Sequence, residues 1–499
     1  MTEDSASGAA NSSLGGPMAR GAAWMVTARW CVRLIGLGST LILARLLTPE
    51  DFGLVAIATS AFAVLDALTD SRFGTALIKY QDATTAEYDA AWTFNILRGL
   101  FLAAVTAAAG PVLGYFYKDP RLVNIALVIA CVAVIQGAFN IGTIDFSKNL
   151  RFDLDFKFLV FNKLLSSATT AALAFAFRNY WALIVGNLAG NVFGLVLSFV
   201  LSPFRPKLGF SAGRRLFGFS VWLMAGNAVT SVGQQMTNII LGAFVPAREV
   251  GIYYVGRDLG TMVTGELVTP ISRVLFPGFS KITGESRRLL EAYQRSIELL
   301  CAIGLPLGIG FALVAREATL ILLGEQWIEA IPVIQTIAVL TSINLISSGS
   351  SSILPALGRT KQVFQINLAS VLLALPVITF LSFRYGLTGA LVANAIGGVF
   401  WAWTHIAAVA RALSISAWDQ IAQSWRSFAS TAFMAIGVFA LGTELGGEAN
   451  IWISLASKVL LGAVLYPACH LALWFLCKRP PGPERLLMDA LAQLRLKIS

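Results

Sequence analysis

Fourteen long apolar segments dominate the sequence and restrict what the chain can fold into. They cover approximately residues 21–46, 52–75, 89–116, 121–144, 157–177, 180–202, 216–244, 250–277, 292–314, 328–354, 362–383, 387–411, 424–442 and 450–477. Only 13% of the residues are charged, against about 25% in soluble domains. A helix of about 20 apolar residues crosses a bilayer, and helices satisfy their own backbone in lipid. The pattern predicts an all-α polytopic membrane protein with about 14 transmembrane helices.

The distribution of lysine and arginine predicts the orientation of these helices. With a cytoplasmic N-terminus, the cytoplasmic loops and tails carry about 22 Lys and Arg and the opposite loops about 7. The same bias accounts for the net charge of +10 without nucleic acid as a partner. An even number of spans also places the C-terminus in the cytoplasm. Residues 1–20 are polar and predict a disordered tail, and 479–499 predict an amphipathic tail on the membrane surface.

Two pairs of similar turns indicate an internal repeat. LLTPEDFGLVAI follows the first span and FVPAREVGIYYV follows the seventh, so that Gly53 and Gly251 are 198 positions apart. KNLRFDLDFK at 148–157 and ALGRTKQVFQ at 356–365 follow the fourth and tenth spans. Six spans per repeat is typical of transporters that bind their substrate near the midplane between two parallel lobes. We therefore expect two pseudo-symmetric six-helix lobes around a central cavity, at 21–205 and 206–413, followed by two extra helices within 414–478.

Two arginines in the first span give the strongest functional indication. Arg29 and Arg33 are four positions apart, so a helix places both on one face. An arginine near the bilayer centre costs about 3 kcal/mol or more, which favours a protein interior or a water-filled cavity. An anion is the ligand that such a face suits. Snorkelling to the interface and pairing with Asp66 and Asp70 on the next span are the alternatives.

Further cations lie inside the other spans. Arg98 enters the third span to a depth of about 14 Å, and Arg257 enters the eighth from the opposite side to about 10 Å. Intramembrane charges are candidates for functional sites. The remaining cations inside spans are Arg72, Lys163, Arg273 and Lys458. The sequence does not place Lys458 relative to a cavity.

A polar stripe runs along the seventh span. Asn227, Ser231, Gln234 and Asn238 recur on one helical face. The stripe suits either contact with a neighbouring helix or a cavity wall that meets sugar hydroxyls. Amides on the fourth and sixth spans are interpreted as contacts between helices: Gln136, Asn140, Asn187 and Asn191.

Acidic residues inside the spans leave two interpretations open. Asp66, Asp70 and Glu266 suit either coupling to a proton or sodium ion or pairing with the intramembrane arginines. The five cysteines lack metal-ligand spacing, and His405 and His470 each stand alone in an apolar segment. We therefore expect no metal, no cofactor and no catalytic constellation.

Four stretches carry a family resemblance. They are LILARLLTPEDFGLVAIATS at 41–60, FGTALIKYQDATTAEYDAAWTFNILRG at 73–99, TPISRVLFPGFSKITGESRRLLEAYQRSIELLCAIGLPLGIG at 269–310, and LLGEQWIEAIPVIQ at 322–335 with LPALGRTKQVF at 354–364. Together they resemble the polysaccharide transporter branch of the MOP flippase superfamily, and within it the Wzx-type lipopolysaccharide and exopolysaccharide flippases.

The resemblance implies a function. Such proteins lie in the bacterial inner membrane and move an oligosaccharide linked to undecaprenyl pyrophosphate from the cytoplasmic to the periplasmic leaflet. Their two lobes enclose a cationic cavity with alternating access, and they work beside polysaccharide polymerase and export machinery. Arginine suits the pyrophosphate because its planar fork binds two oxygens. Arg29, Arg33, Arg98 and Arg257 are then the predicted pyrophosphate ligands, and the polar stripe of the seventh span faces the sugar.

Two other functions compete with this prediction. A multidrug exporter of the same superfamily mostly carries cations and would be expected to have an acidic cavity, whereas basic residues outnumber acids inside these spans. A membrane glycan polymerase would carry a large periplasmic loop, whereas the loops here are short. We therefore expect a transporter and not an enzyme, working as a monomer because two lobes form a complete transport unit.

Overall fold

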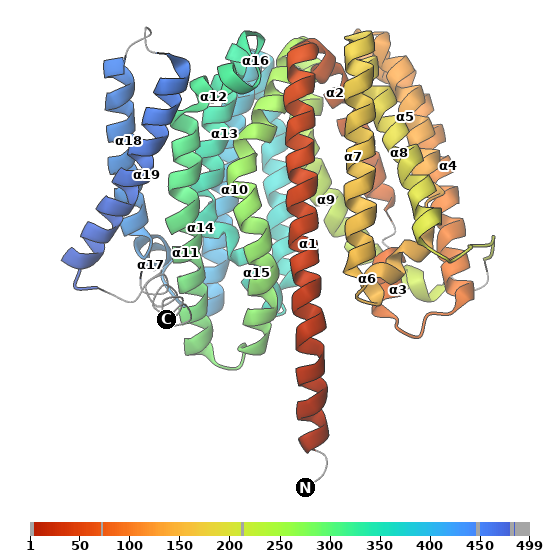
Figure 1. Ribbon diagram of the computed structural model, residues 1–499, viewed down its shortest axis with the longest axis horizontal. Helices are drawn as coiled ribbons and strands as arrows, with labels where there is room; N and C mark the ends of the chain where they lie inside the picture. Colours follow the sequence, from red (N-terminus) through yellow and green to blue (C-terminus); the bar gives the residue numbers. More distant parts are fainter. Residues whose placement is uncertain (1–3, 71–72, 211–213, 446–449, 480–483, 485–499) are drawn as a thin grey trace. The chain divides into compact units, whose positions relative to one another are not determined.

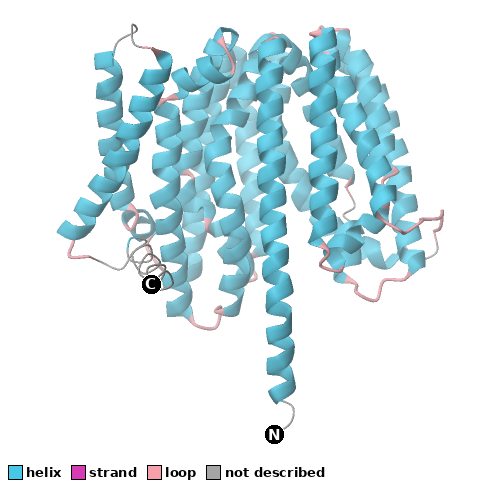
Figure 2. Ribbon diagram, viewed as in Figure 1, coloured by secondary structure: helices cyan, strands magenta, loops and turns pink. Residues whose placement is uncertain are grey.

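The computed structural model describes residues 4–70, 73–210, 214–445, 450–479 and 484. Throughout these ranges the regular structure is helical and contains no strand (Figure 2). The predicted amphipathic segment at 479–499 lies outside the described residues apart from its first residue and Glu484. Helix α1 begins at Asp4, within the stretch for which the sequence predicts a disordered tail.

Figure 1 shows the helices in order along the chain. The first part comprises α1 (Asp4–Leu46), α2 (Pro49–Thr69), α3 (Phe73–Lys79), α4 (Thr85–Phe116), α5 (Arg121–Gly137), η1 (Ile141–Thr143), α6 (Ile144–Lys148), α7 (Phe152–Phe177), α8 (Trp181–Leu201) and α9 (Arg214–Phe244). The second part comprises α10 (Ala247–Lys281), α11 (Ser286–Leu313), α12 (Ala315–Leu322), η2 (Glu325–Ala330), α13 (Ile331–Ile343), α14 (Leu345–Ser348), α15 (Ser350–Ala356), α16 (Thr360–Leu413), α17 (Ala417–Ala422), α18 (Trp425–Leu445) and α19 (Ile451–Leu476).

The helices confirm a polytopic all-α membrane protein. Within the described ranges, ten helices are long and apolar enough to cross a membrane, or eleven if the bent pair 121–137 and 141–148 forms one span. Two expected spans, 362–383 and 387–411, lie within α16, which leaves helical geometry at Gly386 with φ 55° and ψ −134°. Most of each expected segment falls on helix, but the segment 52–75 runs beyond Thr69, where α2 ends, and the segment 121–144 includes the break at 138–140. The count of fourteen membrane spans stays a prediction.

The chain divides into two compact units, Met1–Gly251 and Ile252–Ser499. The sequence places the boundary between lobes earlier, at 205/206. Helix α9 belongs to the first unit because it packs along α2, where Ser231 Oγ donates a hydrogen bond to the carbonyl of Ala63 at 3.1 Å. The proposed limits of the lobes and of the two additional helices therefore stay predictions.

Each unit has two residues with positive φ at matching positions, which supports the internal repeat. Leu150 (φ 56°) and Gly358 (φ 75°) each lie two residues before a long helix and 208 positions apart. The residues that follow them, Arg151 and Arg359, donate their backbone N–H groups five residues back, at 2.7 and 2.9 Å. Farther along, Arg178 (φ 49°) ends α7 and Gly386 interrupts α16, again 208 positions apart. Arg178 has left-handed helical angles (ψ 39°) and Gly386 does not (ψ −134°), so the second pair shares its position and its positive φ only. Positive-φ residues at one offset indicate two copies of a helical pair.

The two glycines of the first sequence echo lie against each other. A Cβ on Gly53 would lie 1.7 Å from the carbonyl oxygen of Ala247, and a Cβ on Gly251 would lie 1.8 Å from that of Pro49. The first turns of α2 and α10 therefore meet backbone to backbone, and the contact is reciprocal. Only glycine permits this approach, since any side chain would need the space that a carbonyl occupies.

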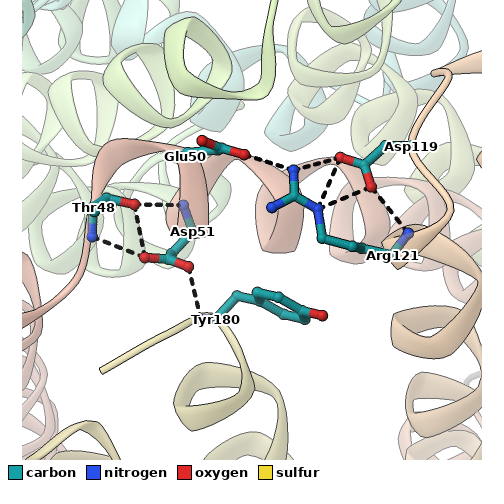
Figure 3. Close-up of polar contacts among 6 residues, drawn as sticks. All are labelled: Thr48, Glu50, Asp51, Asp119, Arg121 and Tyr180. Atoms are coloured by element: carbon teal, nitrogen blue, oxygen red, sulfur yellow. Dashed lines mark hydrogen bonds and ion pairs between the residues drawn. The ribbon is translucent and has the colours of Figure 1, made fainter. Parts of the chain in front are cut away.

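A polar network joins the starts of α2, α5 and α8 (Figure 3). Thr48 caps α2 through a reciprocal pair of hydrogen bonds with Asp51, whose second oxygen accepts the backbone N–H of Tyr180 at 2.8 Å. Arg121 bridges Glu50 at 2.6 Å and Asp119 at 2.7 Å. The hydrogen bonds from Arg121 hold the pKa of the Asp119 carboxyl below its usual range. These contacts fix the ends of three helices in the first unit.

Candidate functional site

A polar pocket in the first unit lies among α1, α7 and α8. Its volume is about 250 Å³, and its lining residues are Val32, Leu159, Asn162, Lys163, Ser166, Asn187, Gly190 and Asn191. One cation and three amides thus converge within the region that the sequence predicts to cross the membrane. Amides and a cation can bind hydroxyl groups and an anion in the same site.

Close packing of α7 against α8 builds this pocket. A Cβ on Gly190 would lie 2.4 Å from Ser166 Oγ, and a Cβ on Gly186 would lie 2.2 Å from Thr170 Oγ1. The glycines let the two helices approach, as small residues do at helix contacts in membranes. The approach brings Asn162 and Lys163 of α7 opposite Asn187 and Asn191 of α8.

The amides of the pocket form a chain of hydrogen bonds. Gln136 Nε2 donates to Asn191 Oδ1 at 3.0 Å, and Asn191 Nδ2 donates to Asn187 Oδ1 at 3.1 Å. Asn162 Oδ1 is buried and accepts no hydrogen bond from the described residues. The sequence interprets the amides of α5 and α8 only as contacts between helices, and the structure brings Asn187 and Asn191 into a cavity as well.

Lys163 is one of the cations inside the spans to which the sequence assigns no role. It lies about 16 Å into α7. Its side chain passes α1 at Gly36, where a Cβ would lie 3.4 Å from Lys163 Cε and 3.7 Å from Nζ. The available signal was the i, i+4 spacing of Asn162 and Ser166 and of Asn187 and Asn191, which places the two side chains of each pair on one helical face.

Arg29 and Arg33 are half-buried on α1. In the sequence they lie on either side of Val32, which lines the pocket. Helix α1 lies along α7 (Figure 1), with the rings of Trp24 and Phe156 in edge contact at 4.9 Å. The two arginines therefore belong to the helix that forms one wall of the pocket. Their function as ligands stays a prediction.

Arg98 of α4 forms an ion pair with Asp66 of α2. It also donates to Thr69 Oγ1 at 3.2 Å and to the carbonyl of Asp66 at 2.9 Å. Asp66 thus has a basic partner, which is one of the two interpretations that the sequence leaves open for it. The side chains of Arg98 and Asp66 remain 22% and 38% exposed, so the pair is accessible to an anion that competes for the arginine.

The polar stripe of α9 divides into two parts. Ser231 bonds to the backbone of α2, and Asn238, 1% exposed, donates to Ser60 Oγ at 2.9 Å. These two side chains make the contact between helices that the sequence offered as the alternative to a cavity wall. Gln234 is exposed and Asn227 is half-buried.

The remaining predicted residues are placed as follows. Asp70 is half-buried at the end of α2, and Arg257 and Glu266 are half-buried on α10. Across the described part of the chain, no group of three or more His, Cys, Asp and Glu side chains is arranged to hold a metal ion.

A multi-pass helical protein with a cationic polar pocket inside its membrane-spanning region has the architecture of a membrane transporter. Among solved structures, the lipid II flippase MurJ in an inward closed conformation has a similar fold, with a TM-score of 0.73, 13% identity, and coverage of 91% of this chain and 99% of MurJ. An inward-facing multidrug resistance MATE family transporter of the MOP superfamily gives a TM-score of 0.55 with 14% identity, covering 77% and 94%.

The sequence comparisons give the family. A family model described as polysaccharide biosynthesis protein matches residues 42–332, and the chain belongs to this family. It is 25% identical to the teichuronic acid biosynthesis protein TuaB of Bacillus subtilis, over 89% of this chain and 93% of that protein. It is 24% identical to the lipopolysaccharide biosynthesis protein WzxC of Escherichia coli, over 76% of each chain. The predicted polysaccharide biosynthesis family is therefore confirmed, and the fold is similar to that of a MOP superfamily transporter.

Proposed function

We propose that the protein is a flippase that moves an oligosaccharide linked to undecaprenyl pyrophosphate from the cytoplasmic to the periplasmic leaflet. It would lie in the bacterial inner membrane, with both termini in the cytoplasm. Relatives named for teichuronic acid, lipopolysaccharide and succinoglycan biosynthesis support a glycan as cargo. The fold shared with a lipid II flippase supports a lipid-linked form of that glycan.

The observation that carries the proposal is the combination of cations and amides inside the membrane-spanning region of the first unit. A lipid-linked oligosaccharide offers a pyrophosphate, many hydroxyls and a long apolar tail. Arg29, Arg33 and Lys163 would bind the pyrophosphate, and the amides around Asn191 would bind the first sugars. The tail would stay in the bilayer while the two lobes alternate access.

The other predicted residues would act at further stages of transport. Arg98 would bind the pyrophosphate after exchanging Asp66 for it, and Arg257 would bind it later. Gln234 and Asn227 are the members of the α9 stripe that we retain as sugar ligands, while Ser231 and Asn238 hold α9 to α2. Asp66, Asp70 and Glu266 stay our candidates for proton or sodium coupling. Asp66 would become available when Arg98 releases it.

Substitution of Arg33 tests this site directly. We expect Arg33→Ala to abolish glycan export with normal membrane insertion, because loss of an intramembrane charge does not hinder insertion. Arg33→Lys should restore part of the export, since it returns the charge without the fork. The measurement is the amount of surface glycan in a deletion strain that carries each variant at equal membrane level.

Two further variants sharpen this test. Lys163→Ala should also reduce export strongly, whereas Lys157→Ala, an exposed cation on the same helix, should export normally. Normal export by Arg33→Ala and Lys163→Ala together would contradict an anion site in this pocket.

The same strains separate the proposal from its competitors. A multidrug exporter would leave the glycan unchanged and protect cells against cationic drugs. A polymerase would leave single repeat units already exposed to the periplasm. We propose neither, and we expect a monomeric transporter that catalyses no covalent chemistry.

A further inference from the structure

A buried ion pair in the second unit involves Lys458, a cation that the proposed transport site does not use. Lys458 lies about 10 Å into α19. Its Nζ lies 2.5 Å from Glu317 Oε1, and the two side chains are 13% and 6% exposed. Ser454, one turn earlier on α19, donates its hydroxyl to the same oxygen at 3.1 Å. Glu317 of α12 therefore receives two donors on one oxygen.

The second oxygen of Glu317 differs from the first. Oε2 is buried and accepts no hydrogen bond from any described residue. Burial alone would raise the pKa of Glu317, but the hydrogen bonds from Lys458 and Ser454 outweigh it and hold the pKa below its usual value. The carboxylate is therefore ionised at neutral pH. A buried anionic oxygen without a donor is costly, and it indicates a partner that the described part of the chain does not supply.

This carboxylate lines a cavity of about 380 Å³ between α12, α13, α18 and α19. Its polar lining consists of Arg316, Glu317, Gln335, Thr443, Ser454 and Lys458. Gly442 of α18 leaves room for the lysine, since a Cβ there would lie 3.1 Å from Lys458 Cε. Two cations and one carboxylate give the lining a net charge of +1, so it favours a ligand that carries a negative charge.

The surroundings of the cavity indicate where this ligand comes from. Phe439 and Ile453, beside the cavity on α18 and α19, are 67% and 61% exposed. Large apolar side chains exposed on membrane-spanning helices contact acyl chains. In the orientation that the Lys and Arg distribution predicts, the cavity faces the periplasmic leaflet. A ligand with its polar group in the cavity could thus keep its apolar part in the bilayer.

We infer that this cavity binds a phospholipid headgroup that has a phosphodiester and a terminal hydrogen-bond donor. The phosphodiester would lie between Arg316 and Lys458. The terminal ammonium of an ethanolamine headgroup, or a hydroxyl of a glycerol headgroup, would donate to Glu317 Oε2. A metal cation does not fit, because two basic side chains surround the carboxylate. A choline headgroup has the phosphodiester but lacks the donor.

The headgroup series provides the test. The full-length protein is purified in detergent, and its thermal unfolding is followed while phosphatidylethanolamine, phosphatidylglycerol or phosphatidylcholine is added. We expect the first two lipids to raise the unfolding temperature at concentrations at least ten times lower than phosphatidylcholine. Equal responses to all three lipids would overturn the inference. An equal response to water-soluble glycerophosphoethanolamine would also overturn it, because the site would then take a free phosphodiester.

Substitutions connect the response to this cavity. Arg316→Gln, at an exposed position, should weaken the ethanolamine and glycerol responses at least tenfold, and Arg287→Gln, 95% exposed on α11, should leave them unchanged.

A second variant tests the carboxylate. Glu317→Gln alone would leave Lys458 without its anion, so Glu317→Gln is combined with Lys458→Met, which removes both charges of the ion pair. That variant should respond equally to the three lipids. Retention of the wild-type order by the double variant, or unchanged ethanolamine and glycerol responses in Arg316→Gln, would contradict the inference. The test contains no glycan cargo, so its failure leaves the proposed flippase function untouched.

Discussion

Arg121 shows how single residues hold the ends of these helices. It bridges Glu50 and Asp119 in the first unit and is 42% exposed, so its ion pairs are partly screened by solvent. Because Asp119 is the better buried of the two acids, at 18% exposed, it is the partner on which stability should depend more.

Replacing Asp119 by asparagine should lower the stability of the protein by about 1 kcal/mol at neutral pH. The pKa of Asp119 is lower in the folded than in the unfolded protein. Its contribution is therefore complete above the unfolded pKa of about 4 and is lost as the pH falls through the folded pKa. Thermal unfolding of wild type and Asp119→Asn between pH 7 and pH 3 should show a difference that shrinks on acidification. Glu325→Gln, at an exposed acid, is the control and should show no such trend. A difference that grows at low pH would contradict this assignment.

Residues also show where sequence reasoning stops. The depth of Arg98 and of Asp66 could be estimated from the chain, but their pairing depends on how α2 and α4 are rotated about their axes. The same holds for Ser231 and Asn238, which share a stripe with Gln234 yet turn toward α2. A helical wheel gives the spacing of side chains, not the neighbour that they face.

At the scale of elements, the contact between the starts of α2 and α10 is the most demanding one in the first unit. Gly53 and Gly251 allow two backbones to meet where no Cβ has space. The sequence indicates these two positions as equivalent through the echo of their turns, but it does not indicate that they touch.

Gly53→Ala should therefore destabilise the protein by about 3 kcal/mol or more, since the new methyl group meets a carbonyl that cannot move aside. Gly38→Ala is the matched control on α1, because a Cβ there has no heavy atom within 4 Å. It should leave stability unchanged or raise it by up to about 1 kcal/mol. The measurement is the unfolding temperature in detergent. Equal behaviour of the two variants would show that the α2 and α10 contact is not close-packed.

The sequence predicted the positions of the helices better than any other feature of the fold. Span positions followed from hydropathy and length, because a long apolar segment in lipid satisfies its backbone hydrogen bonds by forming a helix. Finer features did not follow. The break at Gly386 was expected only as a boundary between two spans, and the division of 328–354 into η2, α13, α14 and α15 has no hydropathy signal. The pocket around Lys163 depends on glycine-mediated packing of α7 on α8, which periodicity alone does not encode.

For the whole molecule, the repeat is the feature that links sequence to transport. Residues with positive φ recur at Leu150 and Gly358, and at Arg178 and Gly386, at one offset. Duplicated helical pairs of this kind are the basis of alternating access in transporters with internal repeats. The family and the fold agree with such a transporter, and the cargo is the part of the account that now needs a measurement.

The central claim is tested by the lipid-linked intermediates of a strain that lacks this protein. They are extracted, identified by mass spectrometry and assigned to a leaflet with a membrane-impermeant reagent. We predict that a complete oligosaccharide repeat unit on undecaprenyl pyrophosphate accumulates in the cytoplasmic leaflet, and that expression of the wild-type protein clears it. Normal glycan, no such accumulation and increased sensitivity to cationic drugs would contradict the account.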